Sequence, residues 1–186
     1  MNTKRATRAL LAAMFAAWIA PGAGAHEPEP DGCRALAHDV VHELAVMRSP
    51  AISLTAEASV DRHPSLDLDK HYAVNLLAQN QLRFAAKPGR ATRAASPRGG
   101  AFQFEVPVTG RYRISITSRH WIDVVDGQKI VESADHFGPA CDVLHKVVEF
   151  DLSAGRKLTL QLSGQDDAII GLAITASPPA PKQERS

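Results

Sequence analysis

Short segments in which apolar and polar residues alternate recur from residue 71 to residue 175, and this period of two constrains the fold more than any other feature of the chain. Successive side chains of a strand point to opposite faces, so alternation is typical of a strand that buries one face. The pattern is clearest over residues 111–117, where Tyr112, Ile114 and Ile116 alternate with polar or charged residues. These segments therefore predict strands that each contribute one face to an apolar core.

Turn-forming residues separate the strands that this pattern predicts. They span residues 71–77, 81–85, 101–108, 111–117, 121–125, 128–131, 146–152, 157–162 and 168–175. Asp126-Gly127, between two of them, predicts a type I′ hairpin turn, in which both central residues have φ above zero. Roughly eight or nine short strands without alternating helices indicate an antiparallel sandwich or barrel, and we expect a jelly-roll-like β-sandwich.

One segment near the start of this region has the periodicity of a helix instead. Residues 33–48 carry a stripe of apolar residues at spacings of three and four, the pattern of an amphipathic helix. The stripe consists of Leu36, Val40, Leu44 and Met47. Asp31 fits the N-cap position, and Ser49-Pro50 stops the helix. The predicted fold is thus mainly β with one N-terminal α-helix.

The first 25 residues have the organisation of a secretory signal peptide. Basic residues precede an apolar run over residues 9–20, and Ala23-Gly24-Ala25 matches the small-residue cleavage pattern. The run is shorter than the roughly 20 residues that span a bilayer, so it predicts export and not a membrane anchor. We expect cleavage after Ala25 and a periplasmic protein without a transmembrane segment.

Removal of this leader, residues 1–25, gives an expected organisation of one domain over residues 33–176. A flexible lead-in at 26–32 precedes it, and a disordered, proline-rich tail at 177–186 follows it. The leader carries three of the 21 basic residues, which leaves 18 against 20 acidic ones. A chain this close to neutral lacks the strong basic field that general nucleic-acid binding needs, so we expect no nucleic-acid partner.

Cys33 and Cys141 are the only cysteines of the chain. In an oxidising compartment such a pair predicts one disulfide, which would close a loop of more than 100 residues. The alternative is a copper or zinc site built from cysteine and histidine, although the chain has no Cys-x-x-Cys spacing.

Parts of the chain resemble known exported sandwiches. Residues 110–114 (GRYRI) and 154–158 (AGRKL) match strand signatures of pre-peptidase C-terminal domains and of carbohydrate-binding jelly-roll modules. This resemblance covers less than half of the chain, and it implies a β-sandwich that serves as a binding module.

A second resemblance is to small exported bacterial proteins of uncharacterised role. It rests on the run from residue 141 to residue 155, on a cysteine near the expected mature start, and on the element that contains Trp121, Asp123, Val124 and Val125. Proteins of this kind are sometimes labelled homogentisate dioxygenase, which is an iron enzyme with two histidine ligands and one glutamate ligand on a larger cupin fold. This chain contains no copy of that ligand motif.

Histidines gather where a metal ion could bind. His136 and His145 flank a predicted loop that contains glycine and proline, and Asp142 lies between them in the sequence. If His120 approached this loop, the group could hold Cu(II) or Zn(II). The alternative is a loop that carries ordinary surface polar residues.

Trp121 is the candidate residue for stacking against a sugar, with Tyr112 as a further aromatic residue and Asp123 as a polar neighbour. The alternative is a buried Trp121, because few other aromatic residues are available to fill a core. The predicted loop over residues 87–100 contains basic residues and no acidic one. It could bind an anionic partner, or its charges could simply face solvent.

No motif supports catalysis. The chain has no Gly-x-Ser-x-Gly, no His-Glu-x-x-His and no phosphate-binding loop. We therefore expect a non-catalytic periplasmic binding or accessory module that engages a partner protein or a glycan and has no cofactor. The alternatives are a copper- or zinc-binding protein that uses the His-rich loop, and a metal-dependent, oxygenase-like enzyme.

Overall fold

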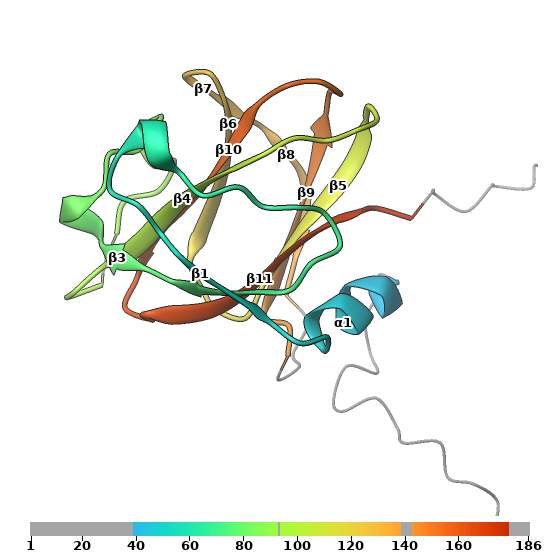
Figure 1. The fold of residues 1–186 in the computed structure, drawn as a ribbon, viewed down its shortest axis with the longest axis horizontal. Helices are drawn as coiled ribbons and strands as arrows, with labels where there is room; N and C mark the ends of the chain where they lie inside the picture. The colour runs from blue at the N-terminus through green and yellow to red at the C-terminus, as the bar shows by residue number, and fades with distance from the viewer. Residues whose placement is uncertain (1–38, 93, 139–142, 179–186) are drawn as a thin grey trace, which may run out of the picture.

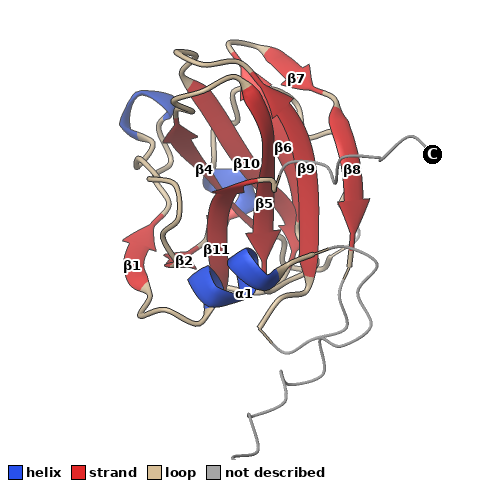
Figure 2. Ribbon diagram, turned by 90° about the vertical axis from the view of Figure 1, so that its right-hand side faces the viewer, coloured by secondary structure: helices blue, strands red, loops and turns tan. Residues whose placement is uncertain are grey.

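Two β-sheets packed face to face form the body of the protein (Figure 1). The computed structural model describes residues 39–92, 94–138 and 143–178. Within these ranges, one α-helix lies against the outer face of the larger sheet (Figure 2). The predicted fold class, a mainly antiparallel β-sandwich with one N-terminal helix, is confirmed.

The larger sheet has six strands in the order β1-β2-β11-β5-β9-β8. Their bounds are β1 Ile52–Thr55, β2 Tyr72–Asn75, β5 Gly110–Ile116, β8 Ser133–Phe137, β9 Lys146–Leu152 and β11 Ile169–Ala176. The smaller sheet has five strands in the order β3-β4-β10-β6-β7. Their bounds are β3 Leu77–Ala78, β4 Arg98–Phe104, β6 Trp121–Asp126, β7 Lys129–Val131 and β10 Leu158–Gln165. Neighbouring strands in both sheets are antiparallel, except that β1 and β2 are parallel.

From β4 onward the chain passes repeatedly from one sheet to the other. As a result β10 lies between β4 and β6, while β5 lies between β9 and β11. Residues that are distant in the sequence therefore become neighbours across strands. Trp121 of β6 is paired with Ser163 of β10, and Ile116 of β5 is paired with Lys146 of β9.

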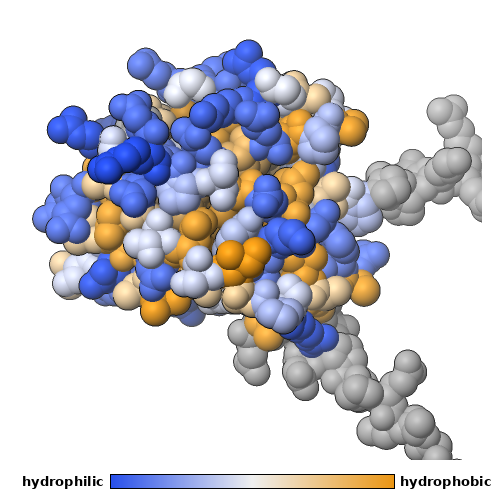
Figure 3. Space-filling model, in the orientation of Figure 1, coloured by the Kyte–Doolittle hydropathy of each residue, from blue (hydrophilic) through white to orange (hydrophobic). Residues whose placement is uncertain are grey.

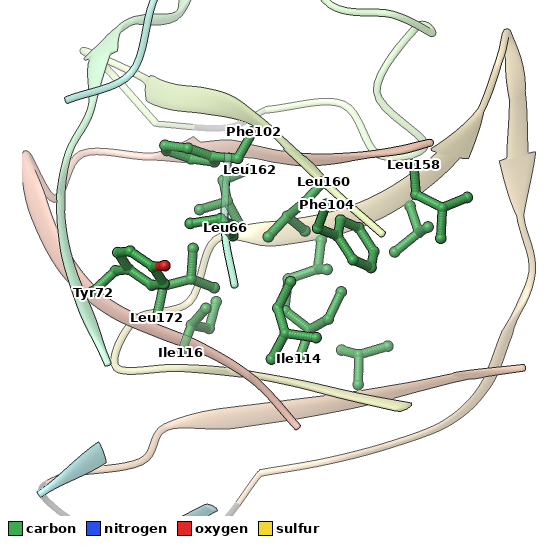
Figure 4. Close-up of a cluster of buried hydrophobic side chains, with 14 of the residues drawn as sticks. Leu66, Tyr72, Phe102, Phe104, Ile114, Ile116, Leu158, Leu160, Leu162 and Leu172 are labelled. Carbon is green, nitrogen blue, oxygen red and sulfur yellow. The ribbon is translucent and has the colours of Figure 1, made fainter. Parts of the chain in front are cut away.

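The main core lies between the two sheets, where the apolar faces of the alternating strands meet (Figure 4). Phe102 of β4 and Leu160 of β10 belong to the smaller sheet, and Ile114 of β5 and Leu172 of β11 face them from the larger one. All four side chains have no exposed surface. Burial of apolar surface contributes roughly 25 cal/mol per Å², so this layer is the main source of stability.

Helix α1, Val41–Met47, covers the outer face of the larger sheet. Leu44 and Met47 pack there against Val147 of β9 and Ala173 of β11 in a second, smaller cluster. The described members of the predicted stripe are therefore buried, and the helix ends before Ser49-Pro50 as predicted. The helix begins at Val41, so residues 39 and 40 are not helical although the prediction included them. Residues 33–38 of the expected helix and Asp31, its expected N-cap, lie outside the described part of the chain.

A group of charged side chains is buried between helix α1 and the larger sheet. Arg113 of β5 donates from Nε to Glu149 Oε1 of β9 at 2.8 Å and from Nη1 to Glu43 Oε2 of the helix at 3.3 Å. The other oxygen of Glu43 accepts a hydrogen bond from Thr175 Oγ1 at 2.8 Å. Glu43, Arg113 and Glu149 are each no more than 5% exposed. Arg113, together with the exposed Arg111, whose Nη1 lies 3.5 Å from Glu149 Oε2, balances the charge of these two buried carboxylates.

The strand predicted over residues 81–85 is wrong. Gln79–Gln81 form a 3-10 turn, and the following residues leave the edge of β4. The neighbouring position along β4 is taken instead by an earlier segment, since Gln103 donates its N–H to the Pro64 carbonyl and Leu66 donates to the Gln103 carbonyl, both at 2.8 Å. A local pattern does not reveal that another segment of the chain already occupies that edge.

The type I′ turn predicted at Asp126-Gly127 is also wrong. Asp126 is paired with Lys129, so the two central residues are Gly127 and Gln128. Only Gly127 has a positive φ, of 64°, which agrees with a type II′ turn and its glycine at the first central position. The hairpin itself is confirmed.

Several sequence predictions lie outside the described residues. These are the signal peptide, the lead-in, both cysteines, Asp142 and residues 179–186 of the expected tail. Ser177, where that tail was expected to begin, donates its backbone N–H to the Arg111 carbonyl at 2.9 Å and is therefore attached to β5. None of the described helices is long and apolar enough to cross a membrane.

Candidate binding site

The loop over residues 83–92, which we call the strap, covers part of the outer face of the smaller sheet. Gln161 of β10 holds it there: its side-chain oxygen accepts from the Ala86 N–H at 3.0 Å, and its side-chain nitrogen donates to the Ala86 carbonyl at 3.1 Å. Thr92 donates its hydroxyl to the Gly164 carbonyl at 3.3 Å. The polar side chain of Gln161, which would otherwise meet solvent, is thereby buried with its hydrogen bonds satisfied.

Trp121 and Asp123 of β6 meet the strap at Gly89. The indole N–H of Trp121 donates to Asp123 Oδ1 at 2.8 Å, and the Gly89 N–H donates to Asp123 Oδ2 at 3.0 Å. A Cβ atom on Gly89 would lie 2.8 Å from Asp123 Oδ1, so any other residue there would have to displace the carboxylate. Asp123 thus orients the indole ring and anchors the strap with its two carboxylate oxygens.

A surface pocket of about 330 Å³ opens beside the ring. Its walls come from four parts of the chain, because the strap, the β5–β6 loop, β9 and the end of β10 converge there. The lining residues are Arg90, Ala91, Arg119, Trp121, Lys146, Ser163, Gly164 and Gln165. Other hollows on the described surface reach 330 to 360 Å³ as well, so the chemistry of this pocket distinguishes it and its size does not.

Positive charge dominates the pocket. Arg90 Cζ lies 5.5 Å and Lys146 Nζ 5.9 Å from the centroid of the Trp121 ring, both within the range of cation–π attraction. Arg119 supplies a third cationic group, and no acidic residue is among the lining residues. Among the described residues, none of these cations forms an ion pair with a carboxylate.

Lys146 is held in place by backbone carbonyls. Its ammonium group donates to the His120 carbonyl at 2.6 Å and lies 3.4 Å from the Arg119 carbonyl. Partial burial, reinforced by the positive charge of Arg90, lowers the pKa of Lys146. Beside it, the buried Ser163 hydroxyl has no hydrogen-bond partner within the described structure. The pocket therefore offers cationic groups and a free hydroxyl to a ligand.

The structure brings two of the three predicted ligand-binding residues together. Trp121 is half-buried in the pocket wall, and Asp123 lies directly behind it, 4% exposed. Tyr112 lies elsewhere: it is 4% exposed in the main core, and its hydroxyl donates to the Val108 carbonyl at 2.7 Å. Tyr112 is thus a core residue and takes no part in this surface.

The predicted metal-binding histidines lie on different elements. His136 is exposed on edge strand β8, opposite Val148, and was expected in a loop. His145 precedes β9, and its N–H donates to the Ile116 carbonyl. His120 is fully buried, with Nδ1 2.8 Å from Ser118 Oγ. Within the described residues no three histidine, cysteine, aspartate or glutamate side chains are placed to hold a metal ion, and Asp142 lies outside them.

Sequence reasoning missed Arg119, Lys146 and Ser163. Arg119 and Ser163 belong to no motif, and Lys146 lies in the run over residues 141–155 without a role assigned to it. Each comes from a different element: the β5–β6 loop, β10 and β9. Arg90 belongs to the basic loop that the sequence analysis singled out. The pairing of Trp121 with Ser163, and of Ile116 with Lys146, brings these residues together, and a single sequence does not reveal strand pairing.

Comparisons with known protein families, curated proteins and solved structures find no match to this chain. The site is therefore interpreted from its own chemistry.

Acidification should destabilise the protein below about pH 6.5. Burial lowers the pKa of both His63 and His120, because it disfavours the charged imidazolium, and Asp61 and Asp167 oppose this only in part. The unfolded chain then binds protons near the ordinary pKa of 6.5 that the folded chain does not, so the free energy of unfolding falls as the pH drops. We expect urea denaturation to show lower stability at pH 5.5 than at pH 7.

A leucine at position 63 separates this effect from other acid effects. Neither ring nitrogen of His63 has a hydrogen-bond partner among the described residues, so His63→Leu removes the proton uptake without breaking a bond. The variant should lose less stability than the parent between pH 7 and pH 5.5. The exposed His136→Gln serves as the control and should retain the parental slope; equal slopes for all three proteins would refute the explanation.

Proposed function

We propose that this chain is an exported, non-catalytic binding module that holds a glycan in the pocket beside Trp121. The observation that carries the proposal is a partly exposed indole ring in the wall of a pocket whose other walls are polar. Aromatic rings that present a face and polar groups together suit sugars, which combine apolar ring faces with hydroxyls. The resemblance to carbohydrate-binding sandwiches points to the same ligand class.

The pocket is organised before any ligand arrives. The indole N–H is fixed by Asp123, which in turn holds Gly89 of the strap, so the ring and one rim of the pocket form a single hydrogen-bonded unit. Ordering these groups in advance lowers the entropic cost of binding. This arrangement favours a binding role.

The described residues also argue against a serine hydrolase at this site. Ser118 and His120 form the hydrogen-bonded pair that such an enzyme needs, with 2.8 Å between Oγ and Nδ1. They are 6% and 0% exposed, however, and neither lines the pocket. A nucleophile that a substrate cannot reach does not support acyl transfer.

The surface gives less support to an accessory module that docks on an apolar partner. The large hydrophobic residues that are most exposed lie on separate elements: Val41, Ile52, Val108 and Ile169. On the face shown in Figure 3, apolar side chains stand among hydrophilic ones. Scattered apolar residues of this kind are normal for a protein surface and do not mark a docking site.

Binding to a glycan array, followed by calorimetry on the glycans retained, tests the proposal. Trp121→Ala should weaken binding by about tenfold or more, since loss of an aromatic contact of roughly 1.5 kcal/mol has that effect. Val108→Ala, on an exposed loop, is the matched control and should bind like the parent. Retention of no glycan, or equal affinity for the Trp121 variant, would overturn the proposal.

A further inference from the structure

We infer that the ligand of this pocket carries an acidic group, a carboxylate or a sulfate on a sugar, which binds between Arg119 and Lys146 beside the Trp121 ring. The inference rests on the proposed function and specifies the chemistry of its ligand. It follows from the charge of the pocket, from the hydrogen-bonding groups left free in it, and from the placement of cations against the ring.

The pocket carries an excess of positive charge. Three cationic side chains line it, and no lining residue is acidic. The Asp123 carboxylate behind the ring accepts hydrogen bonds from the neutral N–H groups of Trp121 and Gly89, and its single negative charge balances one of the three cations at most. Like charges held close together repel each other, and a bound anion removes this repulsion.

Hydrogen-bond donors without a full set of partners line the pocket. An ammonium group has three N–H bonds, and Lys146 directs at most two of them to backbone carbonyls. The Ser163 hydroxyl is buried and unpartnered. Because buried polar groups are normally satisfied, these donors are the part of the pocket that most needs a ligand oxygen. Charge-assisted hydrogen bonds to carboxylate or sulfate are the strongest that they can form.

Arg90 and Lys146 both lie against the indole ring of Trp121. A neutral sugar that stacks on this ring would displace the cation–π contacts, and it has no negative group that could pair with the displaced cations. An acidic sugar can pack against the ring while its acid group pairs with the displaced cations. The pocket therefore selects against neutral sugars as well as for acidic ones.

Matched pairs of ligands test the charge directly. Isothermal titration calorimetry compares oligogalacturonate with its methyl ester, and a sulfated chondroitin fragment with its desulfated form, so each pair differs only in the acid group. At least one acid should bind about tenfold or more tightly than its neutral counterpart. Raising the salt concentration should weaken the acid more than the neutral form, because exposed charges are screened.

Substitutions of the cationic residues show where the acid group binds. Arg119→Gln and Lys146→Gln should each reduce the ratio of the affinity for the acid to the affinity for its neutral counterpart. Arg156→Gln is the matched control, since Arg156 is equally cationic but pairs with Asp126 at the opposite end of β6. Arg119 is exposed, so its variant gives a result even if substitution of the partly buried Lys146 impairs folding.

The outcomes separate the two proposals. Equal affinity for acid and neutral partners, lost in Trp121→Ala, would overturn the acidic ligand and leave glycan binding in place. A titration with sodium sulfate alone, followed through the NMR signal of the Trp121 indole, tests whether the pocket binds an anion without a sugar. If sulfate binds and Lys146→Gln abolishes this, but no glycan binds, the anion site stands and the glycan is overturned. Absence of binding by every acid, by every neutral form and by sulfate would overturn both.

Discussion

Replacement of Arg113 by methionine should destabilise the protein by about 3–5 kcal/mol. Methionine retains much of the side-chain volume but removes the cation that lies 3.3 Å from Glu43 and 2.8 Å from Glu149. Glu149 then keeps only Arg111, whose Nη1 lies 3.5 Å from Oε2. Both carboxylates are at most 5% exposed, so water cannot replace the lost partner. Urea denaturation at pH 7, with far-UV circular dichroism as the probe, measures the loss.

An exposed arginine outside this cluster provides the control for this prediction. Arg156 pairs with Asp126 at 2.7 Å, but the two side chains are 57% and 31% exposed. An exposed pair contributes little to stability, because solvent screens the charges. Arg156→Met should therefore have a small effect, and similar losses for the two variants would show that burial does not govern the strength of these pairs.

Truncation of Phe102 to alanine should cost a similar amount, about 3–5 kcal/mol, through loss of apolar contacts and formation of a cavity. Phe102 is fully buried between the sheets, and its ring fills the space above Gly100, where a Cβ atom would lie 2.8 Å from it. The neighbouring side chains belong to paired strands and cannot collapse freely into the gap. The midpoint of urea denaturation should fall accordingly.

Val108 supplies the comparison, because the same alternation placed it on the face of Phe102. The structure ends β4 at Phe104 and leaves Val108 66% exposed. Val108→Ala should change the free energy of unfolding by no more than about 0.5 kcal/mol. A large loss at Val108, or a small one at Phe102, would contradict the burial on which the core description depends.

The strands with one continuous apolar face were predictable from the sequence. β5, β9 and β11 match their predicted spans within one or two residues, since the apolar residues on their inner faces recur without interruption. The edge strands β1 and β8 were not predicted: β8 is exposed at most positions, so both of its faces accept polar residues and no period appears. Residues 81–85, at the start of the strap, gave the opposite error, a strand that was predicted but does not form. Their apolar and polar residues alternate, yet they pair with no strand of either sheet.

The residues of the candidate site also fall into those that a local pattern reveals and those that only strand pairing brings together. Trp121 and Asp123 lie two residues apart on one strand, so a local pattern sufficed to select them. Arg119 and Lys146 come from a loop and a strand that meet only where the two sheets adjoin. The histidines show the converse, since His120 was grouped with His136 and His145 but is buried beside Ser118.

The sequence by itself determined the period of two, the apolar face of each central strand and the single helix, because these depend on neighbours within a few residues. Strand order and register, the covering of the smaller sheet by the strap, and the convergence of Arg90, Arg119 and Lys146 on Trp121 were decided only by the tertiary structure. Many pairings of the same strands bury the same faces, so alternation alone does not choose among them. The choice depends on how all the strands pack together, and it places a cationic pocket beside the Trp121 ring.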